Sequence, residues 1–384
     1  MKLLKKTLLA TAFAALAASQ SQAQITIVPE NDQFSLKLIG RTNLDAGTYF
    51  NRIDTEHPDN GIAVNDTRLG VSGKFNEKWD YKIEICFDQS KISFRDVFVK
   101  YNFSKAHHIQ AGNFFMPFGL KPLGLAYKFI SNSTIDDSFT PARKIGVAYL
   151  LTTDPFNFTG GVFSNGDIDN GSNAVQFDAG LDLAAKAIYR PIINESTVLH
   201  FGVAAMYTNS EYKGGDVKNR RPKITGSIPK TFSGKNPEVI GNAAVLQDAD
   251  HYSTYEAELI FIQQKFLLES HFQGVGVDDA KGDRYHMGGF LAQCSYLLIG
   301  EQQNYNKVTG LCQNASPKNL EILARYDYLD LHDGGHQHDV TFGLNYFFSK
   351  HFNVKLNYGF AHEHIGEYNH KTYNVLQVRG QFSF

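Results

Sequence analysis

The feature that most constrains this chain is an alternation of apolar and polar side chains, which recurs in segment after segment from Ser35 to the C-terminus. In the segment 79–88, aromatic and aliphatic residues fill the odd positions, whereas acids, Lys82 and Cys86 fill the even ones. A period of two is that of a β-strand whose two faces meet different surroundings. Because the segments are long and their polar faces carry charges and glycine, they favour a lipid-facing exterior around a wet interior over a soluble sandwich.

The number of these segments indicates the size of the sheet. An even number is typical of bacterial outer-membrane barrels, and about sixteen strands leave room for an aqueous channel. The sequence therefore predicts an all-β fold, a transmembrane antiparallel β-barrel of about sixteen strands. The sixteen segments are 35–49, 66–76, 78–88, 92–103, 107–115, 144–151, 156–165, 177–190, 197–209, 250–262, 265–276, 286–300, 317–330, 336–348, 351–364 and 371–384.

The N-terminus reads as a secretory signal peptide. Lys2, Lys5 and Lys6 precede a short apolar run, and Ser21-Gln22-Ala23 supplies a small-x-small cleavage pattern. That run is shorter than the roughly 20 residues that a membrane-spanning helix needs, and no later stretch reaches this length without charge or glycine. A closed barrel is the other way to satisfy every backbone group in lipid. We therefore expect residues 1–23 to be removed on export and 24–384 to form one barrel domain in the bacterial outer membrane.

The connections between segments provide a separate test of this topology. If the N-terminus is periplasmic, odd-to-even connections face outward and should be long, and even-to-odd connections should be tight. The long outward connections include 116–143, 210–249 and 277–285, and the tight ones include 76–77, 263–264 and 349–350. The connection 301–316 breaks the pattern, so either this turn is long or the strand count is wrong there. The chain ends on Val378, Gly380, Phe382 and Phe384 along one face, an ending that resembles the C-terminal signature of outer-membrane barrels.

Composition and motifs exclude several other classes of protein. The formal net charge is −2, and loss of the three leader lysines makes it −5, whereas a nucleic-acid binder normally has a basic excess. Three cysteines are too few for a disulfide-dense scaffold. The sequence contains no Gly-x-Ser-x-Gly, His-Glu-x-x-His or P-loop motif. We expect neither an enzyme nor a protein that requires a cofactor, and no nucleic-acid partner.

Nine sequence blocks run in order over nearly the whole mature chain: 67–73, 79–82, 94–99, 110–119, 142–147, 289–293, 296–301, 321–326 and 342–346. Together they resemble the family of phosphate-selective porins O and P. The resemblance implies a homotrimer of sixteen-stranded channels in which an outer loop folds into each pore. It also implies that Arg and Lys side chains guide anions through the channel. The connection 116–143 matches the position of this constriction loop.

Alternation and the resemblance together predict which residues line the pore. On the first two strands, alternation turns Lys37, Arg41, Arg68 and Lys74 toward the lumen. The family's roles, carried to matching positions, place Arg41, Arg68, Lys121 and Arg143 nearest the anion. The constriction loop adds Lys128 and the hydroxyls of Ser131 and Ser133. Asp96 is expected either to orient the basic residues or to keep the site weak.

The expected function is passive diffusion of small anions, with phosphate or polyphosphate preferred. The alternative is a nonspecific diffusion porin for small solutes, since many such pores also carry arginines balanced by acids. A surface adhesin or assembly barrel without an open channel is less favoured. The basic connection 210–249 suits a funnel that concentrates anions, but equally a solvated loop or a patch that meets acidic lipopolysaccharide.

Six histidines crowd the last two outward connections: His332, His336, His338, His362, His364 and His370. Imidazoles at His-x-His spacing can bind a transition metal. Such residues are more often polar side chains of a loop, and no metal site is predicted here.

Overall fold

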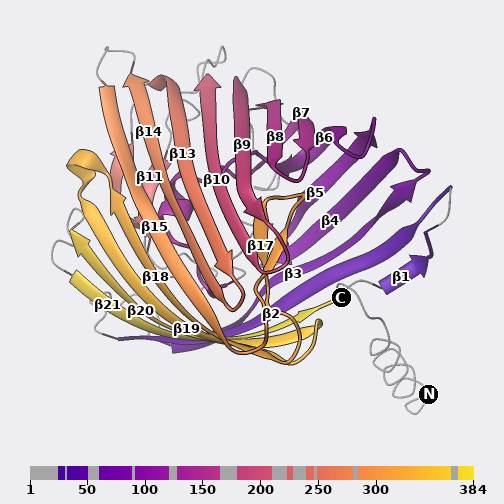
Figure 1. The fold of residues 1–384 in the computed structure, drawn as a ribbon. Helices are drawn as coiled ribbons and strands as arrows, with labels where there is room; N and C mark the ends of the chain where they lie inside the picture. Colours follow the sequence, from indigo (N-terminus) through magenta and orange to yellow (C-terminus); the bar gives the residue numbers. More distant parts are fainter. Residues whose placement is uncertain are drawn as a thin grey trace.

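The computed structural model describes residues 25–30, 33–50, 60–88, 91–120, 128–164, 180–209, 223–227, 239–245, 249–279, 284–364 and 371–384. Within these residues, sixteen antiparallel strands form a closed barrel, because the last strand pairs with the first (Figure 1). Within them, too, no helix is long and apolar enough to cross a membrane.

The barrel strands follow the chain in order around the ring. The first nine are β2 (Leu36–Phe50), β3 (Asn60–Phe75), β4 (Trp79–Asp88), β5 (Lys91–Asn102), β6 (His107–Phe115), β7 (Arg143–Thr152), β8 (Phe156–Ser164), β9 (Leu181–Ile193) and β10 (Thr197–Asn209). The other seven are β13 (Ala249–Gln263), β14 (Phe266–Asp279), β15 (Arg284–Ile299), β18 (Asn319–Asp330), β19 (His336–Phe347), β20 (Phe352–His364) and β21 (Lys371–Ser383). A short extra strand, β1 (Ile25–Val28), pairs with the start of β2.

Each predicted segment overlaps one barrel strand, so the predicted fold class is confirmed. The largest difference is at β3, which starts at Asn60 rather than at residue 66. The exceptional connection 301–316 is a long turn and not a miscounted strand. It contains its own two-stranded hairpin, β16 (Asn304–Asn306) and β17 (Leu311–Gln313), outside the barrel sheet.

Two chemically different faces alternate along the strands, as the sequence pattern indicates. On β10, exposed Phe201, Val203 and Tyr207 alternate with buried His200 and Met206. The exposed row is apolar and aromatic, which suits hydrocarbon and its interfaces. The opposite face turns toward the lumen and carries most of the buried polar side chains, so the polar groups of this protein lie inside the barrel.

Loop length distinguishes the two ends of the barrel. Short turns follow β3, β13 and β19, and Asn76 and Gln264 take up left-handed backbone conformations in two of them. Short turns and the chain termini mark the periplasmic end of outer-membrane barrels, whereas long loops mark the outer end. The C-terminus lies at the short-turn end (Figure 1), and this end is therefore taken as periplasmic.

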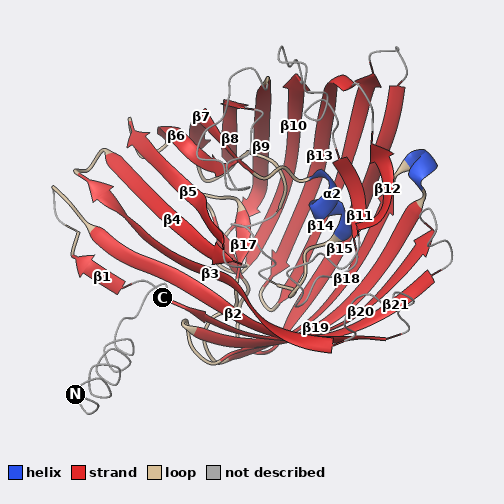
Figure 2. Ribbon diagram, turned by 180° about the vertical axis from the view of Figure 1, so that it is seen from behind, coloured by secondary structure: helices blue, strands red, loops and turns tan. Residues whose placement is uncertain are grey.

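Two connections fold into the lumen from opposite ends (Figure 2). From the outer end comes the loop between β6 and β7, with the helix α2 (Thr134–Phe139). Ile135 and Phe139 of α2 pack in a buried cluster with residues of β14, β15 and β18. The predicted inward-folded constriction loop is therefore present. From the periplasmic end comes the β16–β17 hairpin.

Other described elements complete the fold. A two-stranded sheet of β11 (Lys223–Ser227) and β12 (Val239–Val245) belongs to the connection 210–249, and β11 lies against α2. A short 3-10 turn, η3 (His332–Gly334), links β18 and β19. The predicted leader 1–23, Lys121 and most of the basic connection 210–249 lie outside the described residues.

Candidate functional site

The constriction loop is fixed across the lumen by hydrogen bonds to distant strands. The Ser131 hydroxyl accepts a hydrogen bond from Gln377 Nε2 on β21 at 2.9 Å, and Asn357 Oδ1 on β20 accepts one from the backbone N–H of Ile130 at 2.6 Å. Arg325 of β18 donates to the carbonyl of Ser131 at 3.0 Å. The loop therefore has one defined path across the pore.

Three residues predicted to contribute to the anion site, Lys128, Ser131 and Ser133, hold this loop in place. Lys128 is buried, and its ammonium lies 2.5 Å from Glu321 Oε1 and 3.0 Å from Gln303 Oε1. Ser133 caps α2, since its hydroxyl accepts from the backbone N–H of Asp136. The side chains of Lys128, Ser131 and Ser133 therefore all form hydrogen bonds within the protein.

A row of cations joined by carboxylates begins at a β-bulge between β2 and β3. The register shifts between Arg41 and Asn43, and Asp66 on β3 has a φ of 49°. Short polar residues tolerate this left-handed conformation, and bulges re-aim side chains. Here the Asp66 carboxylate bridges two guanidinium groups, 2.5 Å from Nε of Arg41 and 2.5 Å from Nε of Arg68.

The row continues across β4 and β5 to β7. Glu84 lies 3.2 Å from Arg68 Nη1 and 3.6 Å from Lys82 Nζ. Asp96 is 2.6 Å from Lys82 Nζ and 2.6 Å from Arg143 Nε. A second bulge, between Ile83 and Ile85, sets Asp96 beside these cations. We call this row the basic wall; it consists of Arg41, Arg68, Lys82 and Arg143, joined by Asp66, Glu84 and Asp96.

Exposure divides the cations of the basic wall into two groups. The side chains of Arg41 and Lys82 are 23% and 19% exposed, whereas those of Arg68 and Arg143 are 4% and 3% exposed. Arg143 also stacks on the Phe115 ring, 3.8 Å from its centroid. Arg41 and Lys82 are therefore the cations of the wall that solvent in the lumen reaches most readily.

The remaining predicted cations lie away from this row or outside the described residues. Lys74 is at the periplasmic end of β3, 2.5 Å from Glu30 Oε1, and this hydrogen bond lowers the pKa of the Glu30 carboxyl. Lys37 is partly buried at the start of β2, opposite Ser72. Lys121 lies outside the described residues.

Sequence reasoning assigned Asp96 to the site but missed three members of the basic wall. Alternation did turn Asp66 inward without giving it a role, and it placed Lys82 and Glu84 on the same polar face of their strand. The alternation does not reveal the cross-strand register. This register decides which inward-facing charges lie side by side, and the two bulges shift it.

Carboxylates gather on the other side of the ring, around β15, which is eight strands from β5 in either direction. Asp327 of β18 and Asp339 of β19 are direct cross-strand partners, and both are buried. Arg325 lies 2.8 Å from Asp327, and the Thr134 hydroxyl of α2 donates to Asp339. Glu256 and Glu258 line β13 nearby. The lumen therefore has a basic side and an acid-rich side.

The β16–β17 hairpin packs against the inner side of β10, β13 and β14 and is anchored to β8, β9 and β10. The Tyr305 hydroxyl is 2.9 Å from Nδ1 of His200 and accepts from Arg190 at 3.3 Å. Asn157 Nδ2 donates to the carbonyls of Lys307 and Val308 at 2.9 and 3.1 Å. Burial raises the pKa of Tyr305 to about 12, against the lowering effect of Arg190.

The hairpin and the constriction loop contact each other. Gln303 at the base of the hairpin accepts from Lys128 of the loop, and Leu120 shares a buried cluster with Cys312. Both inserted elements are thus held on the β8–β21 side of the lumen, and they reinforce each other.

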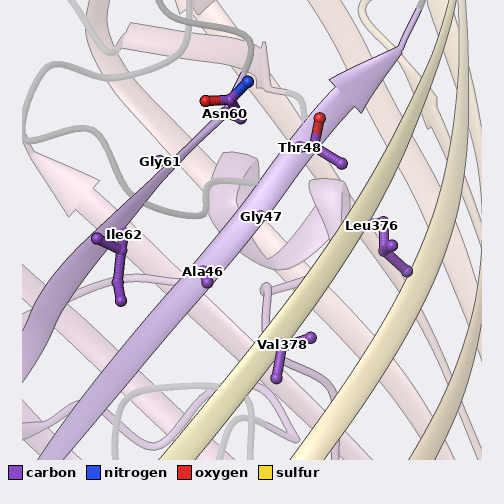
Figure 3. Close-up of a pocket in the computed structure, with 8 residues that line it drawn as sticks. All are labelled: Ala46, Gly47, Thr48, Asn60, Gly61, Ile62, Leu376 and Val378. Carbon is purple, nitrogen blue, oxygen red and sulfur yellow. The ribbon is translucent and has the colours of Figure 1, made fainter.

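A shallow pocket on the outer surface lies apart from the lumen site. It is lined by residues of β2, β3 and β21 whose side chains, apart from the Asn60 amide, are small or aliphatic (Figure 3). Ile62 and Val378 at its edge are exposed members of the apolar outward rows. The pocket is therefore part of the barrel exterior and not of the conduction path. Its lining is Ala46, Gly47, Thr48, Asn60, Gly61, Ile62, Leu376 and Val378.

A closed barrel of sixteen strands, apolar outside and polar inside, with an outer loop folded across its lumen, is the architecture of an outer-membrane porin. The family model of phosphate-selective porin O and P matches residues 36–384, and the chain belongs to this family. Its membership places the protein in the outer membrane, among channels rather than enzymes.

Solved structures share the fold at low sequence identity. A loop-deletion mutant of OmpT, an outer membrane protein of Vibrio cholerae, has a TM-score of 0.60 at 13% identity, covering 92% of this chain and 100% of that one. An anion-selective porin from Comamonas acidovorans has a TM-score of 0.59 at 12% identity, with the same coverage of both chains. An uncharacterized protein of Caulobacter vibrioides is 26% identical over 355 residues, which is 85% of this chain and 68% of the relative.

Proposed function

We propose that this porin passes small anions by passive diffusion and that phosphate or polyphosphate is preferred. The observation that carries the proposal is the basic wall, in which four lumen-facing cations from four strands adjoin only three carboxylates. The family's name and the anion-selective porin among the structural neighbours agree with it.

The physical basis is a series of moderate sites. Arg41 and Lys82 are accessible, and guanidinium donors suit phosphate oxygens. Asp66 and Asp96 compensate part of the positive charge, so an anion that binds is also able to leave. Several weak sites in series conduct better than one deep site, because every ion must exit as well as enter.

The single experiment that tests this is a phosphate titration of chloride current in planar bilayers. Phosphate should reduce the chloride current of the wild-type channel. The variants Arg41→Glu and Lys82→Glu should each raise the half-blocking phosphate concentration at least about tenfold, since a hydrogen bond to a charged group contributes about 1.5–3 kcal/mol.

The matched control is Arg284→Glu, which reverses an exposed arginine that pairs with Asp278 at the outer end of β15. Its block should equal that of the wild type. Chloride current that phosphate leaves unchanged would instead support the alternative, a nonspecific diffusion pore, which is favoured by the acid-rich side of the lumen. Equal block in Arg41→Glu, Lys82→Glu and wild type would remove the basic wall from the conduction mechanism.

We also propose that the mature protein lacks residues 1–23 and forms a homotrimer. The charged and apolar regions of the leader and its cleavage pattern support the first part. A structure of the Vibrio cholerae OmpT described as a trimer form supports the second. Intact mass and native mass spectrometry of the membrane-extracted protein test both; an N-terminus at Met1 or a monomer would contradict them.

A further inference from the structure

Four of the histidines singled out in the sequence meet on the outside of the barrel. His336 and His338 lie at the outer end of β19, and His362 and His364 at the outer end of β20. Their neighbours Gln337 and Glu363 are buried toward the lumen, whereas the four histidines are only partly buried, on the opposite face. We call these four residues the histidine quartet. It lies on the outer surface, separate from the conduction path.

Strand register places the quartet in two directly facing pairs. His336 is the cross-strand partner of His364, and His338 that of His362. The rings of His336 and His338 lie 5.4 Å apart at 86°, and those of His362 and His364 lie 4.7 Å apart at 77°. The rings of His336 and His364 stack at 4.6 Å. The four imidazoles therefore form one continuous group in which each His-x-His pair has its rings nearly perpendicular.

One ring of each pair is oriented by a hydroxyl group. Nδ1 of His338 is 2.7 Å from the Tyr326 hydroxyl on β18, and Nδ1 of His362 is 2.8 Å from the Thr372 hydroxyl on β21. When Nδ1–H donates to the hydroxyl oxygen, the tautomer leaves the electron pair of the ring on Nε2. A second partner that fixes the tautomer in this way accompanies most metal-bound histidines.

The chemistry of the quartet favours a metal over an anion. Binding of phosphate requires imidazolium rings, and several positive charges at 4.6–5.4 Å repel one another. Neutral imidazole is the form that binds zinc, copper and nickel. In the described part of the chain no three histidine, cysteine or acidic donors are arranged around one point, so any one ion would have two imidazole ligands and water.

We propose that the histidine quartet binds a divalent transition metal ion, such as Zn²⁺, Ni²⁺ or Cu²⁺, at the outer rim of the barrel. The two donor pairs are His336 with His338 and His362 with His364, and Tyr326 and Thr372 are positioning residues for one ring of each pair. Two nitrogen donors at about 2 Å and exchangeable water make this a labile surface site. It is independent of the proposed anion conduction.

The test is titration of the purified, detergent-solubilised porin with Cu²⁺, followed by electron paramagnetic resonance and calorimetry. The wild type should show nitrogen coupling from imidazole ligands. The double variant His338→Gln/His362→Gln, which leaves one histidine in each pair, should bind at least about tenfold more weakly. Tyr326→Phe should weaken binding about tenfold with all four ligands intact, which distinguishes positioning from a merely structural role of the hydroxyl.

The matched control is His107→Gln. His107 is an exposed histidine whose Nδ1 lies 2.5 Å from the Tyr149 hydroxyl, so it has a similar hydroxyl partner but is not part of a His-x-His pair. This variant should bind Cu²⁺ like the wild type. Equal affinity of wild type and double variant would overturn the proposal, as would equal losses in the double variant and in His107→Gln.

A measurement on the wild type alone covers the case in which a variant fails to fold. Diethylpyrocarbonate modifies accessible imidazoles, and mass spectrometry of peptides locates the modified residues. Zn²⁺ should protect the four members of the quartet but not His107. Protection spread evenly over all modified histidines, or absent from the quartet, would contradict the proposal. Chloride conductance and its block by phosphate should be the same in the double variant, so failure of the anion proposal and failure of this one are distinguishable.

Discussion

Among single residues, the cations of the lumen differ in accessibility more than in type. Arg41 and Arg68 share the Asp66 carboxylate, yet Arg41 remains 23% exposed and Arg68 only 4%. Alternation predicted correctly that both face inward, because the side-chain period of a strand is fixed. It did not indicate which of them solvent reaches, because this depends on neighbouring strands and on the bulge at Asp66.

The Asp66 carboxylate offers a test of charge compensation. Replacing it in Asp66→Ala removes the acid shared by two arginines, so phosphate should block chloride current at a lower concentration than in wild type. Loss of hydrogen bonds to charged donors should also lower the free energy of unfolding by about 1–3 kcal/mol. Current block in bilayers and urea titration in detergent measure the two effects.

The control for this change is Asp66→Asn. Asparagine tolerates the left-handed conformation at this position and keeps an oxygen acceptor, but it removes the charge. Stronger block in both variants, with the larger loss of stability in the alanine variant, is the expected pattern. Block unchanged in both would mean that Asp66 has no influence on anions in the lumen.

Among the elements, the two inserted segments differ in how much the sequence revealed. The constriction loop was predicted at 116–143 from its length and from the family resemblance, and it folds inward. The hairpin appeared only as an exception at 301–316. Its place in the lumen depends on Tyr305 and Gln303 meeting partners more than a hundred residues away in the chain, and no local pattern encodes such contacts.

Gly310 at the hairpin tip provides a test of its role in the pore. Its φ is +72°, and an added Cβ would lie 2.4 Å from Cδ1 of Ile188. A side chain in this conformation costs about 1–2 kcal/mol, so Gly310→Val should push the tip away from β9 into the lumen and lower the single-channel conductance. Lys307→Ala is the control, because Lys307 is exposed and its pair with Asp154 at 3.8 Å contributes little. A conductance equal to wild type in Gly310→Val would show that the tip does not limit the current.

Tyr305 predicts a pH dependence of the hairpin anchor. Because its pKa is raised to about 12 from the ordinary 10, the unfolded chain loses this proton first as pH rises. The contribution is therefore fully present below pH 10 and falls as pH increases from 10 to 12. Urea titrations across this range should show a steeper loss of stability for wild type than for Tyr305→Phe. Parallel curves for the two proteins would contradict the assignment.

For the whole molecule, the sequence was most informative: the period of two indicated the number of strands, and the lengths of the connections indicated which end of the barrel faces outward. Strand ends were less certain, as at β3, because Gly61 and Ala63 alternate there with Ile62 and Val64 and provide no polar row to mark a strand. The cross-strand positions that create the basic wall and the histidine quartet required the register of the whole ring.

The apolar exterior makes a depth-dependent prediction. Val203 is 60% exposed midway along β10, and Val203→Lys should lower the free energy of unfolding in lipid by about 2–4 kcal/mol. The control, Leu181→Lys, changes an exposed residue at the outer end of β9 and should cost about 0–1 kcal/mol. Urea-driven refolding into vesicles measures both values. Equal costs at the two positions would argue against a membrane-embedded surface.

The pairing of β2 with β21 has a consequence for the order of events during assembly. Arg379 binds Asp45 through two contacts of 2.6 Å, although 334 positions separate them, and β1 covers only the start of β2. Until the final strand has been synthesised and delivered, most of the leading edge of β2 has no neighbour on that side. An uncovered edge is a template for pairing with other chains. Other strands must therefore be prevented from pairing with the free edge of β2 until the rest of the chain, up to β21, has reached the membrane.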